Sequence, residues 1–272
     1  MYFDAHFHLF DNTSLGDNLA ANIGENSSSD YFFKKYHTRE SAIGGVVMGN
    51  GPLETQGENL PDNFYYCVGL DELSYFPLTA EIYNKIKIHL QNPKCVGVKL
   101  YPGYLPIYPN DKQYEPIFKL CIECNKVLAI HTGMPAAVSA KLKYTRPIYL
   151  DDVAIDFPEL KIIMCHFGNP FLEEAAAVME HNSNVYADLS GLIEGNFTTK
   201  YFCETQRDYI NLLKTWIKYI GDSKKFMFGT DWPAVNCIEY QKFISQLFDP
   251  SWLDDVMINN ALKIYNIRLK GL

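Results

Sequence analysis

The chain has 272 residues, of which 47% are hydrophobic and 21% charged, a composition typical of a folded globular protein. Its 24 Lys and Arg against 32 Asp and Glu give a formal net charge of −8. This charge argues against nucleic-acid binding and membrane-surface binding, because both need a basic face. We find no transmembrane run and no signal peptide in the sequence. Seven cysteines, an odd number spread thinly along the chain, predict reduced thiols in a cytoplasmic protein.

Short apolar runs recur along the chain, each with the length and the Val, Ile, Phe or Tyr content of a buried strand. They occupy residues 2–8, 44–49, 64–70, 95–101, 127–131, 161–166, 184–189 and 225–231. Helical patterns follow most of them, at residues 80–91, 113–125, 170–181, 209–220, 238–248 and 252–269.

This alternation predicts an α/β fold, a single (β/α)₈ TIM barrel that spans residues 1–272 as one domain. The alternative is a doubly wound open sheet, which usually carries a Gly-rich turn after its first strand, and no GxGxxG occurs here. Long connections at 9–41, 133–150 and 190–207 are expected at the C-terminal face of the strands. Residues 9–41 are polar and rich in turn residues, so we expect a mobile lid or a disordered loop there.

Histidines and a carboxylate stand at the carboxyl ends of the predicted strands. The first strand ends Asp4-Ala5-His6-Phe7-His8, and side-chain alternation places Asp4, His6 and His8 on one face. His131 ends the fifth strand, His166 ends the sixth and Asp231 ends the eighth.

One strand-end histidine is readily explained as a hydrogen-bonded structural side chain, but four of them with Asp231 on one rim are hard to obtain by packing alone. Imidazole and carboxylate together suit zinc, iron, manganese or cobalt better than calcium. The sequence therefore predicts a divalent metal site.

Five segments resemble the amidohydrolase superfamily, and more narrowly its amidohydrolase 2 branch. They are Asp4-Ala5-His6-Phe7-His8, Val96-Gly97-Val98-Lys99-Leu100-Tyr101-Pro102, His131-Thr132-Gly133, His166-Phe167-Gly168 and Gly229-Thr230-Asp231-Trp232-Pro233. They occur in the right order from residue 4 to residue 233, so the resemblance covers essentially the whole chain.

The resemblance implies a metal-centred barrel in which His6, His8, His131 and Asp231 hold the cation. It implies that His166 either binds the metal or activates the metal-bound water, so His166 is both a candidate ligand and, with Asp231, a candidate catalytic residue. The branch contains enzymes that hydrolyse C–N or C–O bonds in amides and lactones, and others that remove a carboxylate from aromatic or unsaturated acids.

Lys99 stands near the end of the fourth strand, and three interpretations are open. It could be a carboxylated lysine that bridges two metals, or a cation that binds a substrate carboxylate. The third interpretation is a lysine whose stem packs in the barrel and whose amine pairs with a carboxylate. We favour a single metal ion, with zinc as the first choice, and two ions as the alternative.

Four further residues are candidates for supporting roles. Arg146, in the loop after the fifth strand, could bind a substrate carboxylate through two hydrogen bonds, or be solvated. Tyr101 and Trp232 could stack on a planar substrate, or form the wall of the site. Asp188, near the end of the seventh strand, could orient a histidine, or cap a turn.

These observations predict a metal-dependent hydrolase in which a metal-activated water cleaves a C–N or C–O bond of a small molecule. A carboxylate on that molecule is expected if Lys99 or Arg146 binds substrate. The alternatives are a metal-dependent non-oxidative decarboxylase and a non-catalytic metal-binding barrel. A small-molecule substrate is the only partner we expect, and homo-oligomerisation stays open.

Overall fold

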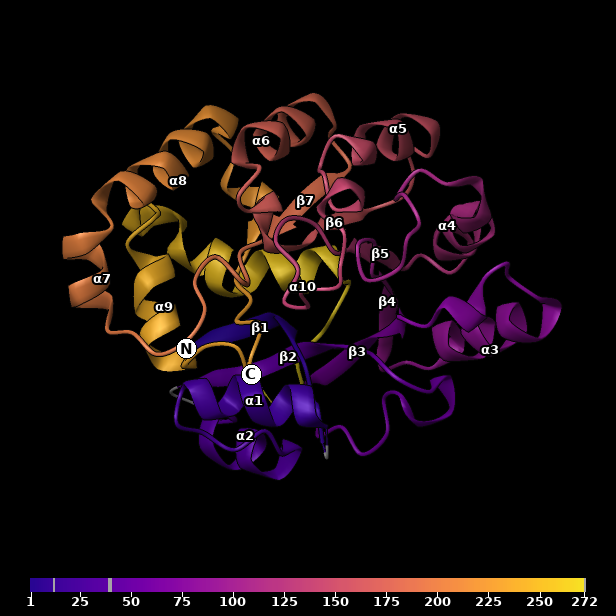
Figure 1. The fold of residues 1–272 in the computed structure, drawn as a ribbon, viewed down its shortest axis with the longest axis horizontal. Coiled ribbons are helices and arrows are strands. Elements are labelled where there is room, and N and C mark those ends of the chain that lie inside the picture. Colours follow the sequence, from indigo (N-terminus) through magenta and orange to yellow (C-terminus); the bar gives the residue numbers. More distant parts are fainter. Residues whose placement is uncertain (12, 39–40, 272) are drawn as a thin grey trace.

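The computed structural model describes residues 1–11, 13–38 and 41–271. Within these ranges, eight parallel strands neighbour one another in sequence order, which confirms the predicted TIM barrel (Figure 1). The strands are β1 (Tyr2–Phe7), β2 (Ala42–Met48), β3 (Phe64–Leu70), β4 (Cys95–Leu100), β5 (Val127–Ile130), β6 (Ile162–Met164), β7 (Val185–Asp188) and β8 (Phe226–Met227). Seven of them end within two residues of a predicted run at both ends, whereas β8 ends at Met227, four residues before the end of its predicted run at 231.

Hydrogen bonds between the first strand and the chain that follows the last strand bring the two edges of the sheet together. The amide of Ala5 donates to Phe228 O at 2.9 Å, and the amide of Asp231 donates to His6 O at 2.8 Å. This pairing places the chain after β8 directly beside the end of β1, where two of the candidate ligands lie.

The helices are α1 (Ser14–Asn22), α2 (Ser29–Tyr36), α3 (Ala80–Gln91), α4 (Glu115–Glu123), α5 (Tyr149–Asp156), α6 (Leu172–His181), α7 (Thr199–Thr205), α8 (Arg207–Ile220), α9 (Cys237–Ser245) and α10 (Asn260–Ile264). Most of them surround the strands on the outside of the barrel, whereas α10 lies behind the strands (Figure 1). The predicted helix at 252–269 is interrupted, since residues Asp255–Asn259 form a π-helical turn before α10. Among the described residues, no helix has both the length and the apolar composition that a bilayer crossing needs.

The expectation of a disordered loop at 9–41 is wrong, because α1 and α2 lie in the described part of this segment, while a mobile lid there stays a prediction. Both helices begin at a hydroxyl cap: Thr13 accepts a hydrogen bond from the amide of Gly16, and Ser28 accepts one from the amide of Tyr31. Burial of the Phe32 ring then holds α2 against the barrel. The polar composition of this segment reflects its exposed face.

Two hydrophobic layers hold the barrel together. The larger layer lies between the strands and the surrounding helices. The smaller one fills the barrel, because nearly every described strand contributes to it, together with α10 and the residues beside it. Tyr265, directly after α10, donates its hydroxyl to Ala5 O at 3.1 Å. The C-terminal segment therefore covers the end of the barrel opposite the candidate site, and α10 crosses behind the strands in Figure 1.

Strand β1 departs from the strict alternation that the sequence predicted. Phe3 and Ala5 belong to the inner layer whereas Phe7 belongs to the outer layer, and the register with β2 shifts between Asp4 and Phe7. The carboxylate of Asp4 accepts hydrogen bonds from the amide and the hydroxyl of Thr230, at 2.9 and 2.7 Å. Asp4 therefore anchors the chain after β8.

Replacement of Phe32 by Ala should lower the free energy of unfolding by about 3–5 kcal/mol, the usual cost of truncating a buried aromatic ring. The Phe32 ring stacks on Phe7 at 4.5 Å and packs against Trp232 at 4.7 Å, so its removal leaves a cavity between α2 and the barrel. Urea denaturation measures the change, with Lys34→Ala on the exposed face of α2 as control. A loss below about 1 kcal/mol would show that α2 is not docked as described.

Candidate metal centre

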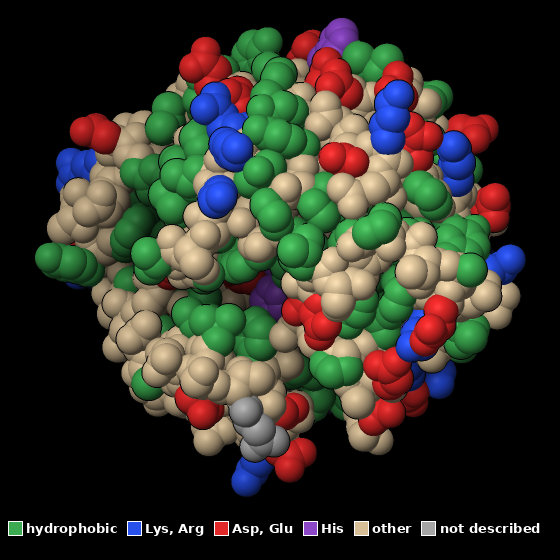
Figure 2. Space-filling model, turned by 45° about the vertical axis from the view of Figure 1, so that its right-hand side comes forward, with side chains coloured by type: hydrophobic (Ala, Val, Ile, Leu, Met, Phe, Trp, Pro, Cys, Tyr) green, Lys and Arg blue, Asp and Glu red, His purple; other side chains and the backbone are tan. Residues whose placement is uncertain are grey.

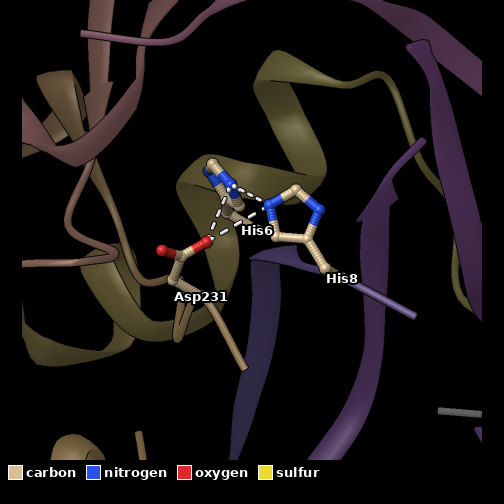
Figure 3. Close-up of side chains that lie close together, drawn as sticks. All are labelled: His6, His8 and Asp231. Carbon is tan, nitrogen blue, oxygen red and sulfur yellow. Dashed lines mark hydrogen bonds and ion pairs between the residues drawn. The ribbon is translucent and has the colours of Figure 1, made fainter. Parts of the chain in front are cut away.

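Three potential ligand atoms converge at the carboxyl end of the barrel (Figure 3). His6 Nε2 lies 3.4 Å from His8 Nε2, and Asp231 Oδ1 lies 3.3 Å from each of these nitrogens. The side chain of His6 is fully buried, whereas those of His8 and Asp231 are 12% and 17% exposed. The triangle is therefore closed toward the barrel and open toward the space above it.

The backbone around this site adopts conformations that ordinary residues rarely take. Asp231 has φ 61°, and His166 and Phe167 have φ 63° and 46°. Residues with side chains are strained in this region, and such strain is typical of functional sites. These left-handed positions stand where the chain leaves β6 and β8, and the side chains of His166 and Asp231 lie beside His6 of β1.

The donor set fits a divalent metal ion. In tetrahedral zinc sites with ligands at about 2.0–2.1 Å, two ligand atoms lie about 3.3–3.4 Å apart, which matches all three sides of the triangle. His6 Nδ1 is 2.9 Å from Asp188 Oδ2, and His8 Nδ1 is 3.0 Å from Met48 O. Since both partners are acceptors, the hydrogen-bond network assigns the proton to Nδ1 in each ring, and Nε2 presents a lone pair when the ring is neutral.

Charges around the triangle favour a cation there. Burial alone would lower the pKa of His6, but the charge of Asp188 raises it well above its usual value. Burial alone would raise the pKa of Asp231, but the neighbouring histidines hold it well below the usual range, so this carboxylate stays ionised. Without a metal ion, the raised pKa means that His6 itself carries a positive charge at this place. A bound cation would replace that proton and face the Nε2 lone pairs of His6 and His8 and the anionic oxygen of Asp231.

His131 and His166 lie beside the triangle and contact each other. His131 Nδ1 is 3.1 Å from His166 Nε2, and the His166 ring centroid is 4.8 Å from that of His6. Burial lowers the pKa of His166 to about 4 and holds that of His131 well below its usual value, so both rings are neutral at pH 7. Neither belongs to the compact triangle, so their predicted roles as ligands stay predictions.

Lys99 is almost fully buried, and its amine lies 2.8 Å from the sulfur of Cys165. No carboxylate of the described residues forms an ion pair with it, so the expected pairing with a carboxylate is not found. Lys99 also lines the pocket above the triangle, as Tyr101 does, which places both within reach of a bound molecule. Tyr101 donates its hydroxyl to Gly49 O at 2.5 Å and so forms a fixed part of the wall.

The pocket above the triangle has a mostly apolar collar. Its side chains come from α1 and from the loops after β1, β4, β5 and β8, and include Phe10, Leu15, Leu19, Tyr104, Met134 and Ala234. Figure 2 shows a histidine at the bottom of a hollow that hydrophobic and acidic side chains surround. The acidic residues among the pocket walls are Asp71, Glu194 and Asp231. Most of these residues carry no motif, which is why the sequence did not reveal them.

Two predicted substrate-binding residues lie elsewhere. Arg146 forms an ion pair with Glu174 and stacks over the Phe171 ring, 4.5 Å from its centroid, so it is held away from the pocket. Trp232 is fully buried and donates its indole N–H to Glu25 at 3.2 Å. A strand-end position indicated proximity to the site, but the side chain of Trp232 turns to the outer layer next to Phe32.

A family model described as Amidohydrolase matches residues 76–267. The chain belongs to this amidohydrolase family. The match includes His131, His166 and Asp231, while His6 and His8 precede it and are brought to the same site by the closure of the barrel. Among curated proteins, no significant match to the sequence is found.

Several solved structures share the fold of this amidohydrolase. An uncharacterized TIM-barrel protein from Bordetella bronchiseptica has a TM-score of 0.72 at 17% identity, with 97% of this chain and 98% of that one covered. A probable 2-pyrone-4,6-dicarboxylic acid hydrolase from Acinetobacter baumannii has a TM-score of 0.68 at 16% identity, with 98% and 99% covered. A 2,6-dihydroxybenzoate decarboxylase from Rhizobium has a TM-score of 0.70 at 14% identity, with 97% and 98% covered. At these identities the likeness concerns the fold alone.

Replacement of Asp188 by Asn should weaken zinc binding about 10- to 100-fold, because the carboxylate that orients His6 and makes Nε2 more basic is lost. Competition with a chromogenic chelator measures the affinity, and circular dichroism checks the fold. Asp71→Asn is the matched control, since this carboxylate lines the same pocket but accepts its hydrogen bonds from Gly51. Equal affinities for the two variants would contradict the role given to Asp188.

Proposed function

We propose that this amidohydrolase is a metal-dependent hydrolase that cleaves a C–N or C–O bond, in an amide, a lactone or a related small molecule. The observation that carries the proposal is the triangle of His6, His8 and Asp231 at the base of a pocket, with its open side toward the pocket. A divalent cation bound there would lower the pKa of water toward about 7 and polarise a carbonyl oxygen.

In this proposal Asp231 moves the proton. Its Oδ1 faces the two histidines, while no donor among the described residues hydrogen-bonds to its Oδ2. The neighbouring histidines hold the pKa of Asp231 low against the effect of burial, so the carboxylate is ionised, which is the form that can accept a proton from the attacking water. Asp231 then returns this proton to the leaving nitrogen or oxygen.

The pocket walls orient the substrate in this proposal. The collar excludes water from the reacting bond, which strengthens every charge interaction beneath it. Tyr101 and the buried amine of Lys99 line the pocket, so a polar or anionic part of the substrate is best placed beside Lys99.

A second candidate is metal-dependent decarboxylation of an aromatic or unsaturated acid. Two observations support it: the fold neighbours include a 2,6-dihydroxybenzoate decarboxylase, and Lys99 offers a cation to a carboxylate at the base of the pocket. A panel of amides, lactones and aromatic acids separates the two candidates, because only decarboxylation releases CO₂.

We further propose zinc as the ion and the cytoplasm as the location. The mixture of imidazole and carboxylate donors supports zinc, although iron, manganese and cobalt accept the same donors. All seven cysteine thiols are unpaired, which supports a reducing compartment.

Asp231→Asn should abolish turnover, because the substitution removes an anionic ligand and the proton carrier together, and His166→Ala should impair turnover severely. The measurement is kcat/KM on the best substrate of the panel, after zinc content and fold have been checked. Activity within about tenfold of the parent, equivalent to about 1.4 kcal/mol of barrier, would remove the residue concerned from the mechanism.

Lys99→Met should leave the metal content at one ion per chain and weaken the binding of a carboxylate-bearing substrate by about 1.5–3 kcal/mol, the value of a charge-assisted hydrogen bond. Elemental analysis gives the metal content, and KM or calorimetry gives the binding. A crystal structure with a carboxylated Lys99 between two metal ions would refute this prediction. Unchanged substrate binding would show that Lys99 only packs in the barrel.

A further inference from the structure

A chain of hydrogen bonds runs from the carboxylate of Asp188 to His131. Ser190 Oγ lies 2.5 Å from Asp188 Oδ1 and 2.8 Å from His166 Nδ1. His166 Nε2 in turn lies 3.1 Å from His131 Nδ1. The next atom along this path, His131 Nε2, is buried and has no hydrogen-bond partner among the described residues.

Chemistry allows one consistent placement of the protons along this chain. The carboxylate of Asp188 is ionised, so the single hydroxyl proton of Ser190 points to it. Ser190 Oγ can then only accept from His166 Nδ1, which must carry the proton of that ring. His166 Nε2 is therefore an acceptor, and the proton between the two imidazoles belongs to His131 Nδ1.

We infer that Ser190 is a positioning residue that fixes the tautomers of both His166 and His131, and so makes His131 Nε2 a metal-ligating lone pair. The inference rests on the proposed function, since it takes the centre to hold a cation. An independent observation supports it. His131 is only 4% exposed and lines the pocket, and its Nε2 has no hydrogen-bond partner among the described residues.

In this arrangement the two carboxylate oxygens of Asp188 orient two ligand residues, His6 and His131. Oδ2 contacts His6 directly, and Oδ1 reaches His131 through Ser190 and His166. Both nitrogens of His166 are occupied in this chain. His166 thus acts by orienting His131. His166→Ala is expected to lose activity because His131 is then no longer held as a metal ligand.

The test is two-bond ¹H–¹⁵N correlation of histidine side chains, which distinguishes the two neutral tautomers directly. Protein labelled at histidine is measured without metal and after zinc loading, as wild type and as the variants Ser190→Ala, Ser190→Thr and Ser27→Ala. Ser27→Ala is the matched control, since Ser27 is also a buried serine that donates to an aspartate, with its Oγ 2.6 Å from Asp17. Zinc affinity is measured in parallel by chelator competition.

In the wild type, His131 and His166 should both carry the proton at Nδ1, and zinc should shift the Nε2 resonance of His131. Ser190→Ala should populate the Nε2–H tautomer of His166 and lower zinc affinity about 10- to 100-fold, while Ser190→Thr and Ser27→Ala should behave as wild type.

An Nε2–H tautomer of either ring in the wild type would overturn the inference, whether or not Ser190→Ala folds. So would zinc binding without a shift at His131 Nε2, or unchanged tautomers and affinity in Ser190→Ala. Absence of zinc binding to the wild type would overturn the proposed function. The spectra of the metal-free protein would even then show which nitrogen of His131 and of His166 carries the proton.

Discussion

Closure of the barrel between its first and last strands is the constraint on which the site depends. The amide of Asp231 donates to the carbonyl of His6, so one hydrogen bond joins the main chains of two residues in the triangle. Asp4, two residues before His6, holds the neighbouring Thr230 with two further hydrogen bonds. His6 lies within β1, and these hydrogen bonds tie the chain that carries Asp231 to that strand, which positions its side chain more accurately than a free loop would.

Asp188 orients several side chains of the site through its hydrogen bonds. A buried carboxylate is costly unless it is fully hydrogen-bonded, and Asp188 accepts from His6, Ser190 and the amide of His166. Burial alone would raise the pKa of Asp188, but the charge and the hydrogen bond of His6 hold it well below the usual range. The charge is thus stabilised by the groups that it orients, so a single anion directs several side chains.

The sequence was informative about the fold because buried strands of a barrel are short, apolar and regularly spaced. It failed at residues 9–41, where helix caps at Thr13 and Ser28 and the buried ring of Phe32 outweigh a polar composition. Candidate ligands at strand ends could be predicted since a barrel gathers those ends on one rim. The orientation of Arg146 and Trp232 could not, because it depends on distant partners, Glu174 and Glu25.

The closed lower end of the barrel has a kinetic consequence. Side chains of the inner layer and the segment around Tyr265 fill the space below the triangle, so an ion cannot leave in that direction. A metal ion bound at the triangle would exchange with solvent through the pocket, past Phe10, Leu15 and Leu19. Two of these residues belong to α1, so this helix would stand beside the path by which a chelator reaches the ion, and its packing would influence the exchange rate separately from the strength of the ligands.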